Sequence, residues 1–196
     1  MLTVLNYGGG NLKSVTNMLD AAGFQCRVTD SPLELSEASK IIFPGQGHFG
    51  QAMESLKTKG LAEALVKKLK EGTPFLGICI GLQVLFESSE EAPNVQGLGV
   101  FKGRVVRFTE GKIPQIGWNK IKTTASNSLL KDDFYYFVNS FYAKPADEKI
   151  ISSTAEYHRQ FAASVERDNI IATQFHLEKS GRSGQNLIET FIRRGF

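Results

Sequence analysis

The sequence predicts an α/β fold: an open, mostly parallel sheet flanked by helices, with antiparallel strands added in the C-terminal half. Through the first half of the chain, short apolar runs alternate with amphipathic helical patterns, which is typical of parallel sheets. From Gly99 onward, short strand-like runs follow one another, which favours antiparallel pairing. No internal repeat, low-complexity tract or linker interrupts the 196 residues. We therefore expect a single domain over residues 1–196.

In the N-terminal half, a predicted strand at residues 2–6 is followed by a helix that Asn11 can cap. Its apolar residues recur at helical spacing, and Gly23 ends it. Proline in the first turn marks a short helix that begins at Ser31-Pro32. A later helix shows the same apolar spacing and closes at Gly72. The predicted strands are thus 2–6, 40–43 and 74–78, and the predicted helices are 11–22, 61–69 and a short one from residue 31.

The C-terminal half contains several runs rich in β-branched and aromatic residues, which predict strands at 104–108, 135–138, 150–153, 161–165 and 170–175. The last helix is predicted over residues 184–194. Its apolar residues Leu187, Ile188, Phe191 and Ile192 should face the core.

A cysteine between two glycines stands where an apolar run gives way to a helical pattern continuing through Phe86. In Gly77-Ile78-Cys79-Ile80-Gly81 a strand would turn sharply into a helix, so close neighbours must lack a Cβ atom. Composition alone predicts roughly 0.02 such matches per chain. A helix N-terminus favours thiolate, and its first free amides point to where an oxyanion would form. The motif predicts a nucleophile; a buried structural cysteine is the alternative.

A nucleophilic thiol needs a general base, and the chain has three histidines. His176 follows a strand-like run, at the kind of strand end where α/β sheets place catalytic groups. Glu178 can orient its imidazole. His158 lies in a charged, hairpin-like stretch that predicts a surface position. His48 belongs to a glycine-rich loop that is either a simple turn or a place where backbone amides approach a ligand. We expect His176 to be the base.

These residues resemble a known family. The motifs Gly77–Gln83 and His176–Ser180 are similar to those of the class I (triad) glutamine amidotransferases. Further segments, similar in order and spacing, narrow the resemblance to the glutaminase subunits of imidazole glycerol phosphate synthase. These segments are Asn6–Asn11, Phe43–Gly47, Pro114–Asn119 and Tyr136–Phe141, so the resemblance covers nearly the whole chain.

The resemblance implies a glutaminase whose catalytic residues are Cys79, His176 and Glu178. Cys79 would attack the side-chain amide of glutamine and form a thioester, while His176 moves protons and Glu178 holds the imidazole. The amides of Ile80 and Gln46 would stabilise the oxyanion. The positions that match the family's glutamine site are Gly45, Gly47, Gln83, Ser140 and Phe141. The resemblance implies no cofactor and no metal ion.

The resemblance also implies a partner. Ammonia released into open water is protonated and diffuses away, so a glutaminase that supplies a synthase gains from being sealed against it. The family's partner is a (β/α)8-barrel cyclase subunit, which receives the ammonia and closes an imidazole ring in histidine biosynthesis. Positions near that interface match Asn11, Trp118, Tyr136 and Lys179. Structural explanations exist too, since Trp118 could belong to the core and Lys179 could be solvated.

Two positions depart from the family's pattern. Leu177 stands where the family usually has proline, and Asn139 where it often has histidine. Leucine leaves the turn between His176 and Glu178 freer than proline would, which bears on the rate more than on the chemistry. Three alternatives stay open: a glutaminase for another acceptor, such as pyridoxal phosphate or an aminated sugar; an inactive amidotransferase-like binding subunit; and a free-standing cysteine hydrolase that needs no partner.

Composition argues against several classes of protein. The net charge is +3 and the basic residues are scattered, whereas nucleic-acid binding calls for a basic stripe or an aromatic platform. No apolar run approaches the roughly 20 residues of a membrane span, and no signal peptide is evident. The cysteines and histidines lack zinc-like spacing. Cys26, in a predicted early strand, is expected to be a buried free thiol. Together these features predict a cytoplasmic protein.

Overall fold

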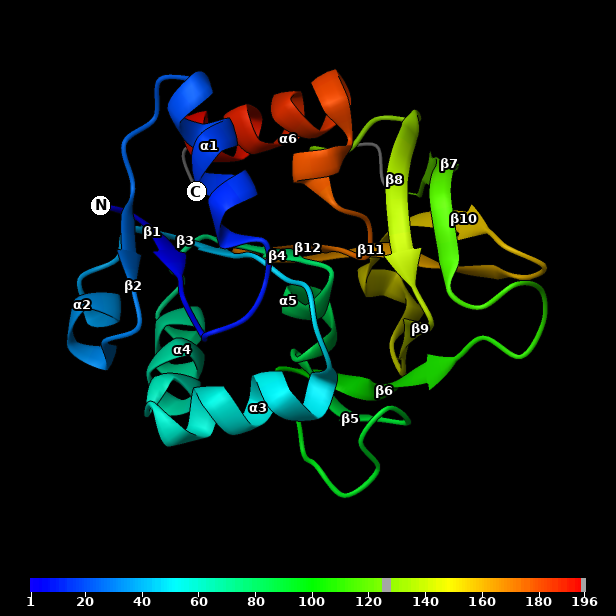
Figure 1. Ribbon diagram of the computed structural model, residues 1–196, viewed down its shortest axis with the longest axis horizontal. Coiled ribbons are helices and arrows are strands. Elements are labelled where there is room, and N and C mark those ends of the chain that lie inside the picture. Colours follow the sequence, from blue (N-terminus) through cyan, green and yellow to red (C-terminus); the bar gives the residue numbers. More distant parts are fainter. Residues whose placement is uncertain (125–127, 195–196) are drawn as a thin grey trace.

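A computed structural model describes residues 1–124 and 128–194 (Figure 1). Its strands are β1 (Leu2–Leu5), β2 (Arg27–Thr29), β3 (Lys40–Phe43), β4 (Phe75–Ile78), β5 (Phe86–Ser89), β6 (Phe101–Arg107), β7 (Gln115–Thr123), β8 (Phe134–Asn139), β9 (Phe141–Pro145), β10 (Ile151–Glu156), β11 (Gln160–Arg167) and β12 (Ile170–Thr173). Its α-helices are α1 (Leu12–Ala21), α2 (Pro32–Ser36), α3 (Phe49–Thr58), α4 (Leu61–Lys70), α5 (Ile80–Gln83) and α6 (Gly181–Arg193), with short 3-10 helices η1 (Glu148–Ile150) and η2 (Leu177–Lys179).

The large sheet has nine strands in the order β2-β1-β3-β4-β12-β11-β10-β7-β8. The strands from β2 to β12 in this order are joined in parallel, and those from β12 to β8 are joined antiparallel. The predicted α/β class, with antiparallel additions in the C-terminal half, is confirmed. A second sheet, β5-β6-β9, lies beside it (Figure 1).

Side chains of the central strands alternate between two hydrophobic cores, one on each face of the large sheet. Ile41 and Phe43 of β3 belong to the core that includes α3 and α4, whereas Ile42 belongs to the core that includes α1 and α6. Figure 1 shows these two helix pairs on opposite sides of the sheet. Because successive side chains of a strand point to opposite faces, a strand covered on both faces is apolar throughout. This is why β3 and β4 are continuous apolar runs in the sequence.

Several elements differ from the sequence-based prediction. The helix predicted after Cys79 does not continue through Phe86: it ends at Gln83, and Phe86 begins β5. Phe86 pairs with Phe101 of β6, and their rings pack at a centroid distance of 5.8 Å, so tertiary packing overrides the helical pattern. β6 belongs to the second sheet rather than to the large one. Cys26 precedes β2 and is only partly buried, not a buried strand residue.

The parallel arrangement gathers loops from distant parts of the sequence. Because β1, β3, β4 and β12 run in the same direction, the loops that follow them lie at one edge of the sheet. Those loops contain the predicted glycine-rich, cysteine and histidine motifs. Within the described ranges, no helix is long and apolar enough to cross a membrane.

Lys40 joins the start of β3 to the end of the last helix. Its Nζ donates hydrogen bonds to the carbonyl oxygens of Phe191 at 3.1 Å, Ile192 at 2.6 Å and Arg194 at 2.5 Å. These carbonyls form the negative end of α6, where a cation is stabilising. Partial burial lowers the pKa of the Lys40 ammonium. Lys40 therefore fixes α6, which carries much of one core, to the central sheet.

We predict that Lys40→Met lowers the free energy of unfolding by about 1–2 kcal/mol, because the apolar stem is kept while the ammonium that binds these carbonyls is lost. Urea unfolding followed by circular dichroism measures the change. Lys13→Met, on the exposed face of α1, is the matched control and should change the free energy by less than about 0.5 kcal/mol. Equal effects of the two substitutions would contradict this role.

Candidate active site

The turn between β4 and α5 holds Cys79 at a positive φ, which few non-glycine residues adopt. Its backbone angles are φ 51° and ψ −99°. The Cys79 amide donates a 2.7 Å hydrogen bond to the Thr173 carbonyl of β12. A Cβ atom on Gly77 would lie 2.6 Å from the Gly81 carbonyl oxygen, and one on Gly81 would lie 2.5 Å from the Phe43 carbonyl oxygen. Close backbone contact therefore requires both glycines, and the predicted strained turn is confirmed.

His176 and Glu178 form a buried pair after β12. His176 Nδ1 and Glu178 Oε1 are 2.8 Å apart, and both side chains are 1% exposed. The His176 amide donates to the Tyr136 carbonyl of β8 at 2.9 Å, which fixes the backbone that carries the ring. Cys79 is close enough to the imidazole to raise its pKa. The structure thus brings the three side chains together.

The charges around His176 favour its protonated form. Burial by itself would lower the pKa of the imidazole, but the Cys79 sulfur and the Glu178 carboxylate outweigh burial and raise the pKa to about 10. A protonated base already holds a proton for a leaving group, and a positive charge beside a cysteine favours thiolate over thiol.

Cys79 and His176 open onto a cavity of about 410 Å³ between the loops at the sheet edge, and Glu178 lies behind His176, outside the cavity lining. A volume of this size suits a small molecule such as an amino acid. The cavity is lined by Gln46, Gly47, Cys79, Ile80, Gln83, Glu91, Pro114, Val138, Asn139, Ser140, Phe141 and His176. Gly45 does not line the cavity: it lies behind Cys79, where a Cβ atom would be 2.3 Å from the Ile78 carbonyl oxygen and 2.6 Å from the Ile80 nitrogen.

Four lining residues lie outside the predicted site: Glu91, Pro114, Val138 and Asn139, of which Glu91 and Asn139 have polar side chains. Glu91 comes from the loop after β5 and accepts a 2.7 Å hydrogen bond from the Phe49 amide at the start of α3. It stands in a run of acidic residues without a motif, so no sequence signal singles it out. Asn139 donates a 3.0 Å hydrogen bond through Nδ2 to the Phe141 carbonyl. Its place beside Ser140 and Phe141 could have indicated that it lines the site.

Tyr7 anchors the loop that contains Gln46 and follows β3. The Tyr7 hydroxyl donates a 2.7 Å hydrogen bond to the Gln46 carbonyl. The Tyr7 ring stacks on Phe43 at a centroid distance of 5.1 Å, and burial raises the pKa of its phenol. The loop that follows β1 therefore holds the loop that follows β3, next to Cys79.

The other two histidines lie away from the thiol. His158 is exposed in the hairpin between β10 and β11, with φ 57°, as the sequence predicts. His48 is the N-cap of α3, and its Nδ1 accepts a 3.1 Å hydrogen bond from the Gly50 amide. Neither lines the cavity next to Cys79.

Leu177 occupies the first position of η2, where a proline is well tolerated because the amide has no partner within the helix. Its side chain is buried in the core beneath α6. A Cβ atom on Gly184 would lie 2.0 Å from the Leu177 carbonyl oxygen, so α6 packs directly against this turn. Packing therefore holds the turn that proline would otherwise stiffen.

Three of the four predicted interface residues form a cluster beside the site, in which Trp118 is exposed and Tyr136 and Lys179 are half-buried. Trp118 is 56% exposed, and its ring meets the Tyr136 ring edge-on at a centroid distance of 5.9 Å. Lys179 Nζ lies 6.0 Å from the Tyr136 ring centroid. The strand register places exposed Ile116 and Phe134 on the same face. This surface, formed by Ile116, Trp118, Phe134, Tyr136 and Lys179, is called the β7–β8 face below.

Asn11, the fourth predicted interface residue, precedes α1. Its Oδ1 accepts a 2.6 Å hydrogen bond from the Ser14 hydroxyl. It lies in the loop after β1, at the same sheet edge as Cys79 and His176.

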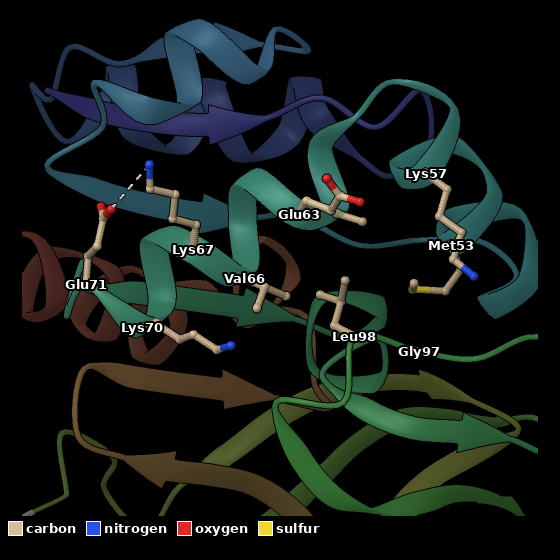
Figure 2. A pocket seen from close by; sticks show the side chains of 10 residues that line it. Met53, Lys57, Glu63, Val66, Lys67, Lys70, Glu71, Gly97 and Leu98 are labelled. Carbon is tan, nitrogen blue, oxygen red and sulfur yellow. Dashed lines mark ion pairs between the residues drawn. The ribbon is translucent and has the colours of Figure 1, made fainter.

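A larger cavity, of about 570 Å³, lies elsewhere, along α3 and α4 (Figure 2). Its lining combines apolar side chains such as Met53, Val66 and Leu98 with lysines and glutamates, and it contains no cysteine or histidine. It therefore lacks a nucleophile and base like those around Cys79.

Comparison with known proteins agrees with these observations. The family model "Glutamine amidotransferase class-I" matches residues 3–194. The imidazole glycerol phosphate synthase subunit HisH of Methanothermobacter thermautotrophicus is 42% identical over 196 residues, which cover 98% of each chain. The chloroplastic imidazole glycerol phosphate synthase hisHF of Arabidopsis thaliana is 43% identical over 200 residues, which cover 98% of this chain and 34% of that protein.

A solved structure described as a crystal structure of glutamine amidotransferase shares the fold. Its TM-score is 0.79 at 18% identity, and the match covers 97% of this chain and 96% of that one. Because the family model extends over almost all of the sequence, this chain belongs to the class-I glutamine amidotransferases.

Proposed function

We propose that this chain is the glutaminase subunit of an imidazole glycerol phosphate synthase, which hydrolyses glutamine and passes ammonia to a (β/α)8-barrel cyclase subunit in histidine biosynthesis. The observation that carries the chemistry is that Cys79 and His176 line a cavity of about 410 Å³ while buried Glu178 holds His176 Nδ1 from behind. The observation that carries the pathway is 42% identity, over 98% of each chain, to a protein with that name.

In the first half of the proposed reaction, Cys79 Sγ attacks the side-chain amide carbon of glutamine and an S–C bond forms. The carbonyl oxygen becomes an oxyanion, which the amides of Ile80 and Gln46 stabilise. As the C–N bond breaks, the His176 imidazolium gives its proton to the departing nitrogen and ammonia leaves. The product on the enzyme is a glutamyl thioester, and Glu178 holds the imidazole throughout.

In the second half, a water molecule gives a proton to neutral His176 and attacks the thioester carbon. The C–S bond then breaks, glutamate leaves, and the sulfur regains its negative charge beside the imidazolium. The starting ion pair is restored, so no external acid or base is consumed.

The cavity supplies groups for the amino-acid end of glutamine. We assign the α-ammonium group to the Glu91 carboxylate, because an anionic side chain at the wall of a small cavity pairs with a cation. Gly47, Gln83, Ser140 and Phe141 line the same cavity. We assign Gly45 to backbone packing behind Cys79, because its lack of a Cβ atom allows the close approach to Ile80.

We place the cyclase on the β7–β8 face and near Asn11. Exposed large apolar side chains beside a polar rim are typical of surfaces that a partner covers. The carbonyl of Tyr136 accepts the amide of His176, so a partner that moves β8 also moves the base. We also propose that residues 1–196 form a single domain. We propose a cytoplasmic location, because free cysteines such as Cys26 and Cys79 persist in a reducing compartment.

We predict that Cys79→Ala and His176→Ala lower glutamine hydrolysis by more than about 10³-fold, because each removes a group that bonds to or exchanges a proton with the substrate. His158→Ala is the matched control and should keep most of the activity, since His158 is exposed on the β10–β11 hairpin. Glutamate release by the purified variants with the cyclase measures this. Substantial turnover without Cys79, or none without His158, would overturn the assignment.

We also predict that Cys79→Ala lowers the pKa of His176 from its value of about 10, because burial then acts against fewer opposing charges. The ring would lose its proton at a lower pH than in the wild-type protein. Nuclear magnetic resonance of the imidazole nitrogens follows this titration directly, and His158 in the same sample serves as an internal reference. An unchanged His176 titration would show that the sulfur does not govern the protonation of the base.

A third prediction concerns control by the partner. The glycines of Pro44–Gly47 make reorientation of the Gln46 peptide sterically cheap, and loss of one oxyanion donor costs roughly 10²–10³ in rate. We expect the isolated chain to be nearly silent and the cyclase with its acceptor nucleotide to restore about that factor. Glutamate production is compared for the chain alone, with cyclase, and with cyclase plus nucleotide. Equal rates in all three would favour a free-standing hydrolase.

A further inference from the structure

A buried amide side chain contacts the proposed nucleophile, and the reaction described above does not use it. Gln174, between β12 and His176, is fully buried, and its Nε2 lies 3.6 Å from Cys79 Sγ. This distance is within the range of a hydrogen bond to sulfur. Because Gln174 is buried, its side-chain amide needs hydrogen-bond partners inside the protein.

The neighbouring hydrogen bonds fix which end of the Gln174 amide faces the sulfur. The Phe141 carbonyl can only accept, so the Gln83 group that lies 3.2 Å from it must be the Nε2 amide. The same Gln83 nitrogen donates to Gln174 Oε1 at 3.1 Å. With its oxygen held by Gln83, Gln174 presents its Nε2 to Cys79. The order of donors and acceptors is thus set by a backbone carbonyl.

The segment that carries Gln174 surrounds Cys79 on several sides. The Thr173 carbonyl accepts the Cys79 amide, the Gln174 amide reaches the sulfur, and the sulfur raises the pKa of the His176 imidazole. An N–H donor stabilises a thiolate more than a thiol, because hydrogen bonds to charged groups are stronger. The oxygen end of the same amide would repel the thiolate.

We propose that Gln174 is a further catalytic residue, whose side-chain amide donates a hydrogen bond to the Cys79 thiolate. The inference rests on the proposed function, in which Cys79 is the nucleophile. The amide acts twice: it holds the thiolate before attack, and it stabilises the sulfur again when the C–S bond of the thioester breaks. In the thioester the sulfur carries no negative charge, so the hydrogen bond is strongest when sulfur is the attacking or leaving group.

The test replaces Gln174 with a side chain of similar shape that cannot donate. In Gln174→Met, the ultraviolet absorbance of the thiolate is followed against pH, after subtraction of the same variant carrying Cys79→Ser. Below the transition, the thiolate signal should be about tenfold lower than in the wild-type chain. Gln115→Met, another buried glutamine, on β7, is the matched control and should leave the thiolate signal unchanged. An unchanged signal in folded Gln174→Met would overturn the proposal.

Two further measurements separate this role from a structural one. With the cyclase present, the loss of glutaminase activity in Gln174→Met should be larger at low pH than at high pH, because more thiolate forms as pH rises; a loss that does not decrease with pH contradicts the proposed stabilisation of the thiolate before attack. In the unmodified chain, which carries no folding risk, the side-chain amide protons of Gln174 should shift as Cys79 loses its proton and should not shift in Cys79→Ser. Absence of this shift also overturns the proposal.

Failure of the inference is distinguishable from failure of the proposed function. If the wild-type chain with its cyclase does not hydrolyse glutamine, the function is wrong whatever the thiolate titration shows. If it does hydrolyse glutamine and the titration is unaffected by Gln174→Met, only the role of Gln174 is wrong.

Discussion

The active site depends on backbone segments that approach one another more closely than any residue with a Cβ atom would allow. Cβ atoms on Gly45, Gly77 and Gly81 would each lie 2.3–2.6 Å from backbone atoms of the neighbouring segments. Real Cβ atoms do not approach so closely, so each substitution would push the strands apart. This contact forces the chain to turn at Cys79 with a positive φ and lifts the thiol above the sheet edge. The parallel strands then bring the loops after β3 and β12 to the same place.

Burial and charge act against each other at the base. Burial disfavours a charged imidazole, yet the sulfur and Glu178 raise the pKa of His176 to about 10. The two side chains are held in place by backbone hydrogen bonds, Cys79 through the Thr173 carbonyl and His176 through the Tyr136 carbonyl. Tyr136 also belongs to the β7–β8 face. A partner docked on that surface would thus touch a strand that is hydrogen-bonded to the backbone of the base.

The strongest sequence patterns predicted the fold correctly because they are local. Continuous apolar runs identified β3 and β4, and the glycine–cysteine–glycine spacing identified the strained turn at Cys79. The prediction that Phe86 is helical is wrong because its secondary structure depends on pairing with Phe101, fifteen positions along the chain.

The site shows the same division between local and distant signals. Cys79, His176 and Glu178 belong to motifs with fixed spacing, so they could be identified together. The sequence does not assign a role to Glu91 or Gln174. Glu91 lines the cavity and Gln174 contacts the Cys79 sulfur, and both positions depend on the assembled sheet. The role of Leu177 also becomes clear only in three dimensions, where α6 packs on its carbonyl through Gly184.

The most direct test of the account is to trap the acyl-enzyme. The chain, its cyclase and the acceptor nucleotide are mixed with glutamine, quenched in acid within a few turnovers, digested and analysed by mass spectrometry. The account predicts a glutamyl thioester on the peptide that contains Cys79, while the peptide that contains Cys26 stays unmodified as an internal control. Continued glutamate production with no adduct on Cys79, or an adduct on a different residue, would contradict the central claim that the strained cysteine is the nucleophile.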